Sequence, residues 1–183
     1  MSLSATDIAP ASRYTGTAVA LHWVIAGLIA CALVMGWIMT ELAFSPLKLK
    51  MFNWHKWVGI TVLALAVIRL AWRLTHRPPA MVPMPAIQAF AAHAIHVALY
   101  ILMFLQPISG WLHSNAAGYP VVYLGVLPLP NLVTKNHDLS DFFEEMHELL
   151  GWTLLILFAL HALAALKHHL LDKDMTLRRM LPW

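Results

Sequence analysis

GWTLLILFALHALAAL, residues 151–166, is an almost wholly apolar stretch that contains one histidine, His161. Acidic residues precede it and basic residues follow it, which suits the dipole of a helix that begins before the stretch and ends after it. We therefore predict one long helix from Asp141 to Asp172. A helix of that length and composition can cross a membrane.

A second histidine, His147, lies near the start of the same predicted helix, 14 residues before His161. At 3.6 residues per turn the two side chains lie within about 40° of one face and about 21 Å apart along the axis. His168 continues that face about two turns further on. Two imidazoles on one side of an apolar helix, near its opposite ends, are what a membrane protein that carries electrons between two haems needs.

The composition is also that of a membrane protein. Of the 183 residues, 60% are hydrophobic and 11% are charged, and the mean hydropathy is +0.68. Soluble domains are usually about half apolar and a quarter charged. The length fits a single domain over residues 1–183. Because Met1–Ser12 has no basic segment, and the first apolar run is too long for a signal peptide, we expect no cleavable signal.

Three other apolar segments precede the last one, so the sequence predicts an all-α fold, an integral membrane four-helix bundle with haems between the helices. The predicted helices cover residues 17–40, 46–75, 87–113 and 141–172.

Local signals support these boundaries. Ser45 and Pro46 are a typical N-cap followed by proline in the first helical position. Asp141 and Glu144 resemble a capping box that opens the last helix. The segment 77–85 holds four prolines and is a linker, and residues 114–140 form the longest loop.

Basic residues divide unevenly between the two sides of the predicted bundle. Eight fall on the side of the chain ends: Arg13, Arg69, Arg73, Arg77, Lys167, Lys173, Arg178 and Arg179. Four fall on the other side: Lys48, Lys50, Lys56 and Lys135. By the positive-inside rule, this predicts a multi-pass protein of the bacterial inner membrane with both termini in the cytoplasm.

Histidines within the predicted spans are the candidate functional residues, because ionisable side chains inside a membrane usually mark a site. The outer level holds His55, His113 and His147, and the inner level holds His22, His93, His96, His161 and His168. A six-coordinate b-type haem needs two imidazoles at one depth on facing helices. Depth allows His147 to pair with His55 or His113, and the position of His113 near a helix end favours His55. At the inner level, spacing leaves both His22 and His96 open as the partner of His161.

Other metal centres lack their ligands. The lone cysteine, Cys31, excludes an internal disulfide, c-type haem attachment and thiolate-rich zinc or iron–sulfur sites. Glu144-x-x-His147 is the only Glu-x-x-His motif, whereas a di-iron bundle needs two. Gly151 stands where a zinc motif would need its second histidine. No basic patch outside the membrane margins supports nucleic-acid binding.

Four motifs in order cover nearly the whole chain. They are LHW (21–23), NWHKWVG (53–59), AHAIHVALY (92–100) and MHELLG…LHALAALKHHLLDKDMTLRRMLP (146–182), the last being the most specific. With these motifs the chain resembles the bacterial cytochrome b561 family, four-helix di-haem membrane proteins that include the superoxide oxidases.

The resemblance implies two haem b groups, one held by His22 and His161 on the cytoplasmic side and one by His55 and His147 on the periplasmic side. It also implies a quinone site near His168. The expected activity is superoxide oxidation coupled to ubiquinone reduction, with superoxide, ubiquinone and membrane lipid as partners.

Two rival functions and one residue role stay open. One rival is a structural or transport protein whose histidines only pack helices. The same haems could carry electrons from quinol to a periplasmic redox partner, or anchor such a partner, with the acidic stretch 138–148 as its docking surface. Arg69 and Arg73, one turn apart at the inner end of the second helix, either anchor that end by their charge or pair with the propionates of the inner haem.

Overall fold

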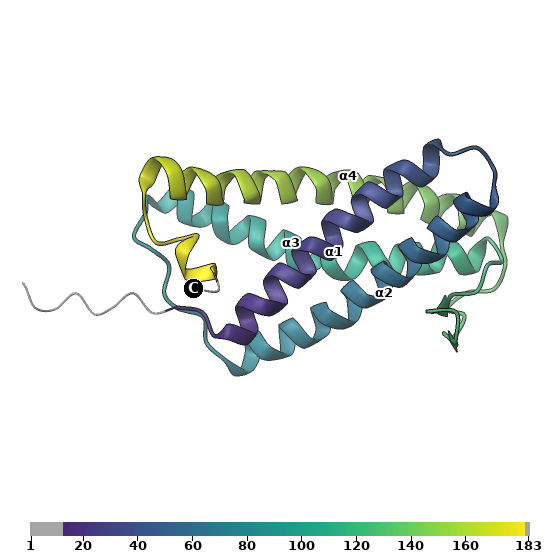
Figure 1. Cartoon of the computed structure of the whole chain (residues 1–183), viewed down its shortest axis with the longest axis horizontal. Helices are drawn as coiled ribbons and strands as arrows, with labels where there is room; N and C mark the ends of the chain where they lie inside the picture. Colours follow the sequence, from purple (N-terminus) through teal and green to yellow (C-terminus); the bar gives the residue numbers. More distant parts are fainter. Residues whose placement is uncertain (1–12, 182–183) are drawn as a thin grey trace, which may run out of the picture.

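A computed structural model describes residues 13–181, and four long helices dominate it (Figure 1). They are α1 (Gly16–Glu41), α2 (Pro46–Thr75), α3 (Ala86–Ala116) and α4 (His137–Lys167). All four are long and apolar enough to cross a membrane. The predicted all-α membrane bundle is confirmed. The expectation that Met1–Ser12 contains no cleavable signal concerns residues outside the described part of the chain.

The helices run alternately up and down, so the bundle has two different ends (Figure 1). We call one the terminal end, because it holds the start of α1, the linker 76–85 and residues 168–181. We call the other the hairpin end, because it holds residues 42–45 and the loop 117–136. That loop contains two short antiparallel strands, β1 (Val122–Tyr123) and β2 (Leu127–Pro128).

The start of α2 follows from two adjacent residues. The hydroxyl of Ser45 accepts a hydrogen bond from the backbone N–H of Lys48 at 3.2 Å, and Pro46 occupies the first helical position. The helix coincides with its predicted span. The first helix begins one residue before its predicted span and ends one residue after it. The third helix begins one residue before its predicted span and ends three residues after it.

The predicted start of the last helix at Asp141 is wrong. The helix α4 begins at His137, and its N-cap is Asn136, whose side chain accepts from the backbone N–H of Leu139 at 3.0 Å. Asparagine caps as well as aspartate does, and Asp138 already supplies the negative charge that the first turn favours. Asp141 lies one turn inside, 2.9 Å from His137.

The last helix ends at Asp172, as predicted, but its final turn is not α-helical. The α-helix stops at Lys167, and residues His168–Asp172 form one π-helical turn, after which Lys173 adopts a left-handed conformation with φ +53°. This reverses the chain, so that residues 173–181, the C-terminal strap, return over the terminal end (Figure 1). The strap is tied to α1 by the indole N–H of Trp23, which donates to the carbonyl of Met180 at 2.6 Å.

The buried core lies at mid-height. Its seven residues come from all four helices: Ile25, Ile29, Val62, Ala66, Leu102, Met103 and Leu154. In the sequence of α4, Leu154 stands midway between His147 and His161. The core is therefore an apolar layer between two levels of histidines, and the many exposed apolar residues outside it suit a lipid environment.

The N-cap of α4 gives the first prediction. Replacing Asn136 with alanine should lower the free energy of unfolding by about 1 kcal/mol, because the backbone N–H of Leu139 loses its capping acceptor. The matched control is Asp141→Ala, which removes only an exposed ion pair and should change stability much less. Chemical unfolding in detergent measures the stability of both variants. Equal losses of stability would contradict the assignment of Asn136 as the N-cap.

Candidate functional site

At the hairpin end, His55 of α2 and His147 of α4 face each other. Their ring centres are 6.0 Å apart and the ring planes are inclined by 84°. Metal–imidazole bonds are about 2 Å long, which places two rings on opposite sides of one metal ion with their centres roughly 6 Å apart. His113, the rival at this level, instead has its Nδ1 3.1 Å from the carbonyl of Ser140.

Two polar residues of α3 hold the imidazole of His147. Its Nδ1 lies 3.1 Å from the carbonyl oxygen of Gln106 and 3.0 Å from the hydroxyl of Ser109. An Nδ1–H that donates to a carbonyl leaves Nε2 with the lone pair that a metal needs. Sequence reasoning did not single out Gln106 and Ser109. The signal that could have found them is their polarity on either side of Pro107 and Ile108, within an apolar span.

Glycines leave space beside both rings of this pair. A Cβ at Gly110 would lie 2.8 Å from Cε1 of His147, and one at Gly36 would lie 3.5 Å from Cε1 of His55. A side chain at position 110 would therefore displace the imidazole or fill the space that a flat cofactor beside it requires.

At the terminal end three imidazoles meet. The ring of His161 lies 6.0 Å from that of His22 on α1 and 5.1 Å from that of His96 on α3. Both candidates that depth left open are therefore close to His161. The separation of His22 from His161 equals that of the outer pair, whereas that of His96 is shorter, and the choice of His22 also rests on the family motif.

Arg69 points into the bundle at this same level. Its Nη2 lies 3.3 Å from Nδ1 of His22, its Nε donates to the hydroxyl of Tyr100 at 3.1 Å, and its Nη1 donates to the carbonyl of Ala18 at 3.4 Å. Arg73 is exposed and stacks on the ring of Tyr100. Of the two roles open for these arginines, anchoring suits Arg73, whereas Arg69 lies beside the candidate ligands.

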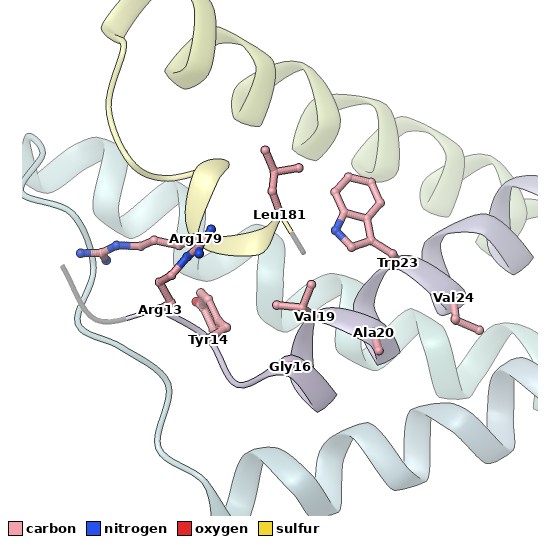
Figure 2. Close-up of a pocket in the computed structure, with 9 residues that line it drawn as sticks. All are labelled: Arg13, Tyr14, Gly16, Val19, Ala20, Trp23, Val24, Arg179 and Leu181. Atoms are coloured by element: carbon pink, nitrogen blue, oxygen red, sulfur yellow. The ribbon is translucent and has the colours of Figure 1, made fainter. Parts of the chain in front are cut away.

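Next to the inner histidines is a cavity of about 650 Å³ between the first half of α1 and the C-terminal strap (Figure 2). Trp23 and Leu181 form part of its wall, with Arg13, Tyr14 and Arg179 at its polar side. The ring of Trp23 also lies edge-on to His22, with ring centres 5.3 Å apart. The cavity is thus one side chain away from a candidate metal ligand. A second cavity of about 340 Å³ shares Arg13 and Leu181 with the first.

His168 is not among the residues that line either cavity, within the described part of the chain, whereas His169 lines the second. The Nδ1 of His168 lies 2.7 Å from a carboxylate oxygen of Asp174 and 3.0 Å from one of Asp172. Partial burial opposes ionisation of Asp174, but hydrogen bonds from Thr176 and His168 outweigh it and lower the pKa of that carboxyl. The π-helical turn thus holds His168 by one nitrogen.

The sequence model of the prokaryotic cytochrome b561 family matches residues 13–183. The chain belongs to this family. It is 36% identical over 171 residues to cytochrome b561 homolog 2 of Escherichia coli K12, covering 92% of this chain and 91% of that protein. It is 31% identical over 176 residues to the probable superoxide oxidase CybB of Yersinia pestis, covering 93% and 96%. Cytochrome b561 homolog 1 of E. coli K12 is 33% identical over 176 residues, covering 93% and 98%.

Membership makes this chain a membrane cytochrome of electron transfer that binds b-type haem. The residues present suit that group: imidazole pairs at the separation of axial ligands, a backbone carbonyl on one Nδ1, and glycines that leave space beside the rings. Of the predicted residues, the structure brings together His55 with His147 and His22 with His161.

The glycine beside His147 gives the second prediction. Gly110→Ala should reduce the haem bound per protein, because the added methyl group overlaps the imidazole. The matched control is Gly27→Ala, where a Cβ meets nothing within 4 Å. Both changes replace a helical glycine by alanine and gain similar helix propensity. The ratio of haem absorbance to protein measures the effect, and equal haem content in the two variants would contradict it.

Proposed function

We propose that this cytochrome holds two b haems and oxidises superoxide at its periplasmic face, passing the electrons to ubiquinone at its cytoplasmic face. In this proposal the terminal end is cytoplasmic and the hairpin end is periplasmic, in the inner membrane of a bacterium. The excess of basic residues at the terminal end supports that orientation. The likeness to a probable superoxide oxidase supports the reaction.

One observation carries the proposal: two histidine pairs with equal ring separations lie at two levels of one bundle. The pair His55–His147 would hold the outer haem and the pair His22–His161 the inner one. Because α4 supplies one ligand to each level, the two sites are about 21 Å apart along a single rigid helix. Each site is then near one membrane surface, which is what an electron path across the membrane requires.

The overall reaction balances as two superoxide anions giving two molecules of oxygen and two electrons, with quinone taking up two electrons and two protons to give quinol. Bound b haem supplies the one-electron oxidation and reduction. The protein supplies two ligands to each haem and an apolar layer between them. Superoxide needs only access to the outer site.

The cavity at the terminal end suits a quinone headgroup. Apolar residues line most of it, and Tyr14, Arg13 and Arg179 bring hydrogen-bond donors to one side. The Nε of Arg179 is buried and has no hydrogen-bond partner among residues 13–181. A carbonyl oxygen of the quinone would satisfy it. Contact between Trp23 and His22 would keep the headgroup close to the inner haem.

We place His168 at the far side of this quinone site, as the residue that supplies a proton. It lies seven residues after His161, on nearly the same face of the helix and about 10 Å nearer the membrane surface. The second cavity extends from Arg13 to His169, the neighbour of His168. Because two carboxylates hold its Nδ1, its Nε2 is the atom left to serve a quinone oxygen.

Arg69 would serve the inner haem. A neutral imidazole has one nitrogen lone pair, so Nδ1 of His22 cannot accept from Arg69 while Nε2 binds iron. Arg69 would therefore leave His22 for a better acceptor, and a haem propionate is an anion of the right kind.

The alternative, electron exchange with a periplasmic redox partner, is favoured by one feature. The first part of α4 presents five exposed acidic residues at the hairpin end: Asp138, Asp141, Glu144, Glu145 and Glu148. A basic partner protein would dock there, and its binding would weaken as salt concentration rises.

The third prediction tests the proposed function. A pulse of superoxide given to the oxidised, haem-loaded protein should reduce it, and added ubiquinone should reoxidise it, as followed by the haem absorbance. His55→Ala or His147→Ala should each lose one of the two haems and abolish reduction by superoxide. His22→Ala or His161→Ala should lose the other haem and abolish reoxidation by quinone.

The control for this series is His96→Ala, which removes a neighbour of His161 without removing a proposed ligand. It should keep both haems. A protein that loads both haems but is not reduced by superoxide would favour the partner-dependent alternative. Loss of a haem in His96→Ala but not in His22→Ala would overturn the inner assignment.

The fourth prediction concerns His168. His168→Ala should keep both haems and their reduction by superoxide, while slowing reoxidation by ubiquinone by about tenfold or more, as expected for loss of a positioned proton donor. The control is His76→Ala, an exposed histidine of the terminal end that stacks on Trp72. Equal reoxidation rates in the two variants would remove His168 from the quinone site.

A further inference from the structure

The loop at the hairpin end has an unusual composition. From Ala117 to Thr134 it contains no charged residue, and charge returns at Lys135. The apolar side chains at its tip point outward, with Val126 83% exposed, Leu124 58% and Leu127 57%, whereas Val121 is buried. A loop in water is usually polar, so this surface is suited to a non-aqueous neighbour.

The loop is fastened to the side of a membrane-spanning helix. The indole N–H of Trp57 donates to the carbonyl of Val122 at 2.7 Å, and the hydroxyls of Tyr123 and Thr61 are 2.9 Å apart. Trp57 is also where the uncharged stretch of α2, Trp57–Ile68, begins. The strands β1 and β2 therefore lie at the depth where this helix enters the apolar part of the membrane, and Figure 1 shows them beside α2.

Several backbone N–H groups of this loop have partners within the protein. The N–H of Gly125 donates to Val122, that of Val126 to Tyr123 and that of Leu129 to Val121. The N–H of Leu132 donates to the side chain of Asn115 at 2.9 Å. Prolines at 120, 128 and 130 have no N–H to satisfy. Unpaired backbone groups are what normally keep a loop out of lipid, and these N–H groups are paired.

We infer that the hairpin Val122–Pro128 inserts its tip into the lipid of the leaflet at the hairpin end. We choose lipid as the neighbour of the tip, because the hairpin is attached to α2 beside the exposed face of that helix. Trp54, one turn before Trp57 on the same face, is itself exposed. A charged redox partner would find no complementary charge on this surface. The inserted tip fixes the depth of α2, and with it that of His55, two residues from Trp57.

A spin label measures this depth in the haem-loaded, full-length protein reconstituted in lipid nanodiscs. The label is placed at Val126→Cys in a Cys31→Ser background. The label at position 126 is compared with labels at two reference positions. Native Cys31 is exposed at mid-height of α1 and reports lipid, and Asp138→Cys in the Cys31→Ser background reports water. Haem content is checked for each variant. Collision rates with oxygen, which partitions into lipid, and with a water-soluble nickel chelate are compared.

The label at 126 should collide with oxygen more than with the nickel chelate, as at Cys31 and opposite to position 138. Nickel collisions at 126 as frequent as at 138 would place the tip in water and overturn the inference. A label shielded from both reagents would mean that protein covers the tip, and would also overturn it. None of these outcomes depends on superoxide or quinone chemistry.

Discussion

A polar group in hydrocarbon must find its partner inside the protein, and the rest of this structure depends on that constraint. Four apolar helices can cross the membrane because their backbones satisfy themselves. The candidate ligand histidines His22, His55, His147 and His161 cannot, and each of them faces another imidazole, a carbonyl or a guanidinium. What pairs them also makes them useful, because two facing imidazoles are the ligand set of a b haem.

Much of this arrangement could be predicted from the sequence. The spans follow from apolar length, and Ser45–Pro46 marked a helix start correctly because both signals act within one turn. Depth left His55 and His113 as partners for His147, and the position of His113 near a helix end favoured His55, which faces His147 in the structure. At the inner level depth was insufficient. His22 and His96 are both close to His161, and nothing in their spacing along separate helices ranks them.

What the sequence could not supply depends on side-chain direction and on tertiary contacts. Arg69 and Arg73 are one turn apart, yet one faces the inner histidines and the other is exposed. The sequence predicted a helix start at Asp141, whereas α4 begins earlier, with Asn136 as its N-cap. The cavity near His22 has a wall from the C-terminal strap, which reaches it only because the chain reverses at Lys173. The hydrophobic periodicity of the sequence does not predict such a reversal.

The apolar layer between the two histidine levels has an electrical consequence. Its seven buried residues are aliphatic side chains and a methionine, none of which carries a proton. In the proposed direction an electron then moves as uncompensated charge from the periplasmic side toward the cytoplasmic side, which is the negative side of an energised membrane. Each electron would work against about 2.3 kcal/mol per 100 mV for a full crossing, and proportionally less for part of it. The turnover of this cytochrome should therefore respond to the energy state of the cell, because the membrane potential acts on the transferred electron itself.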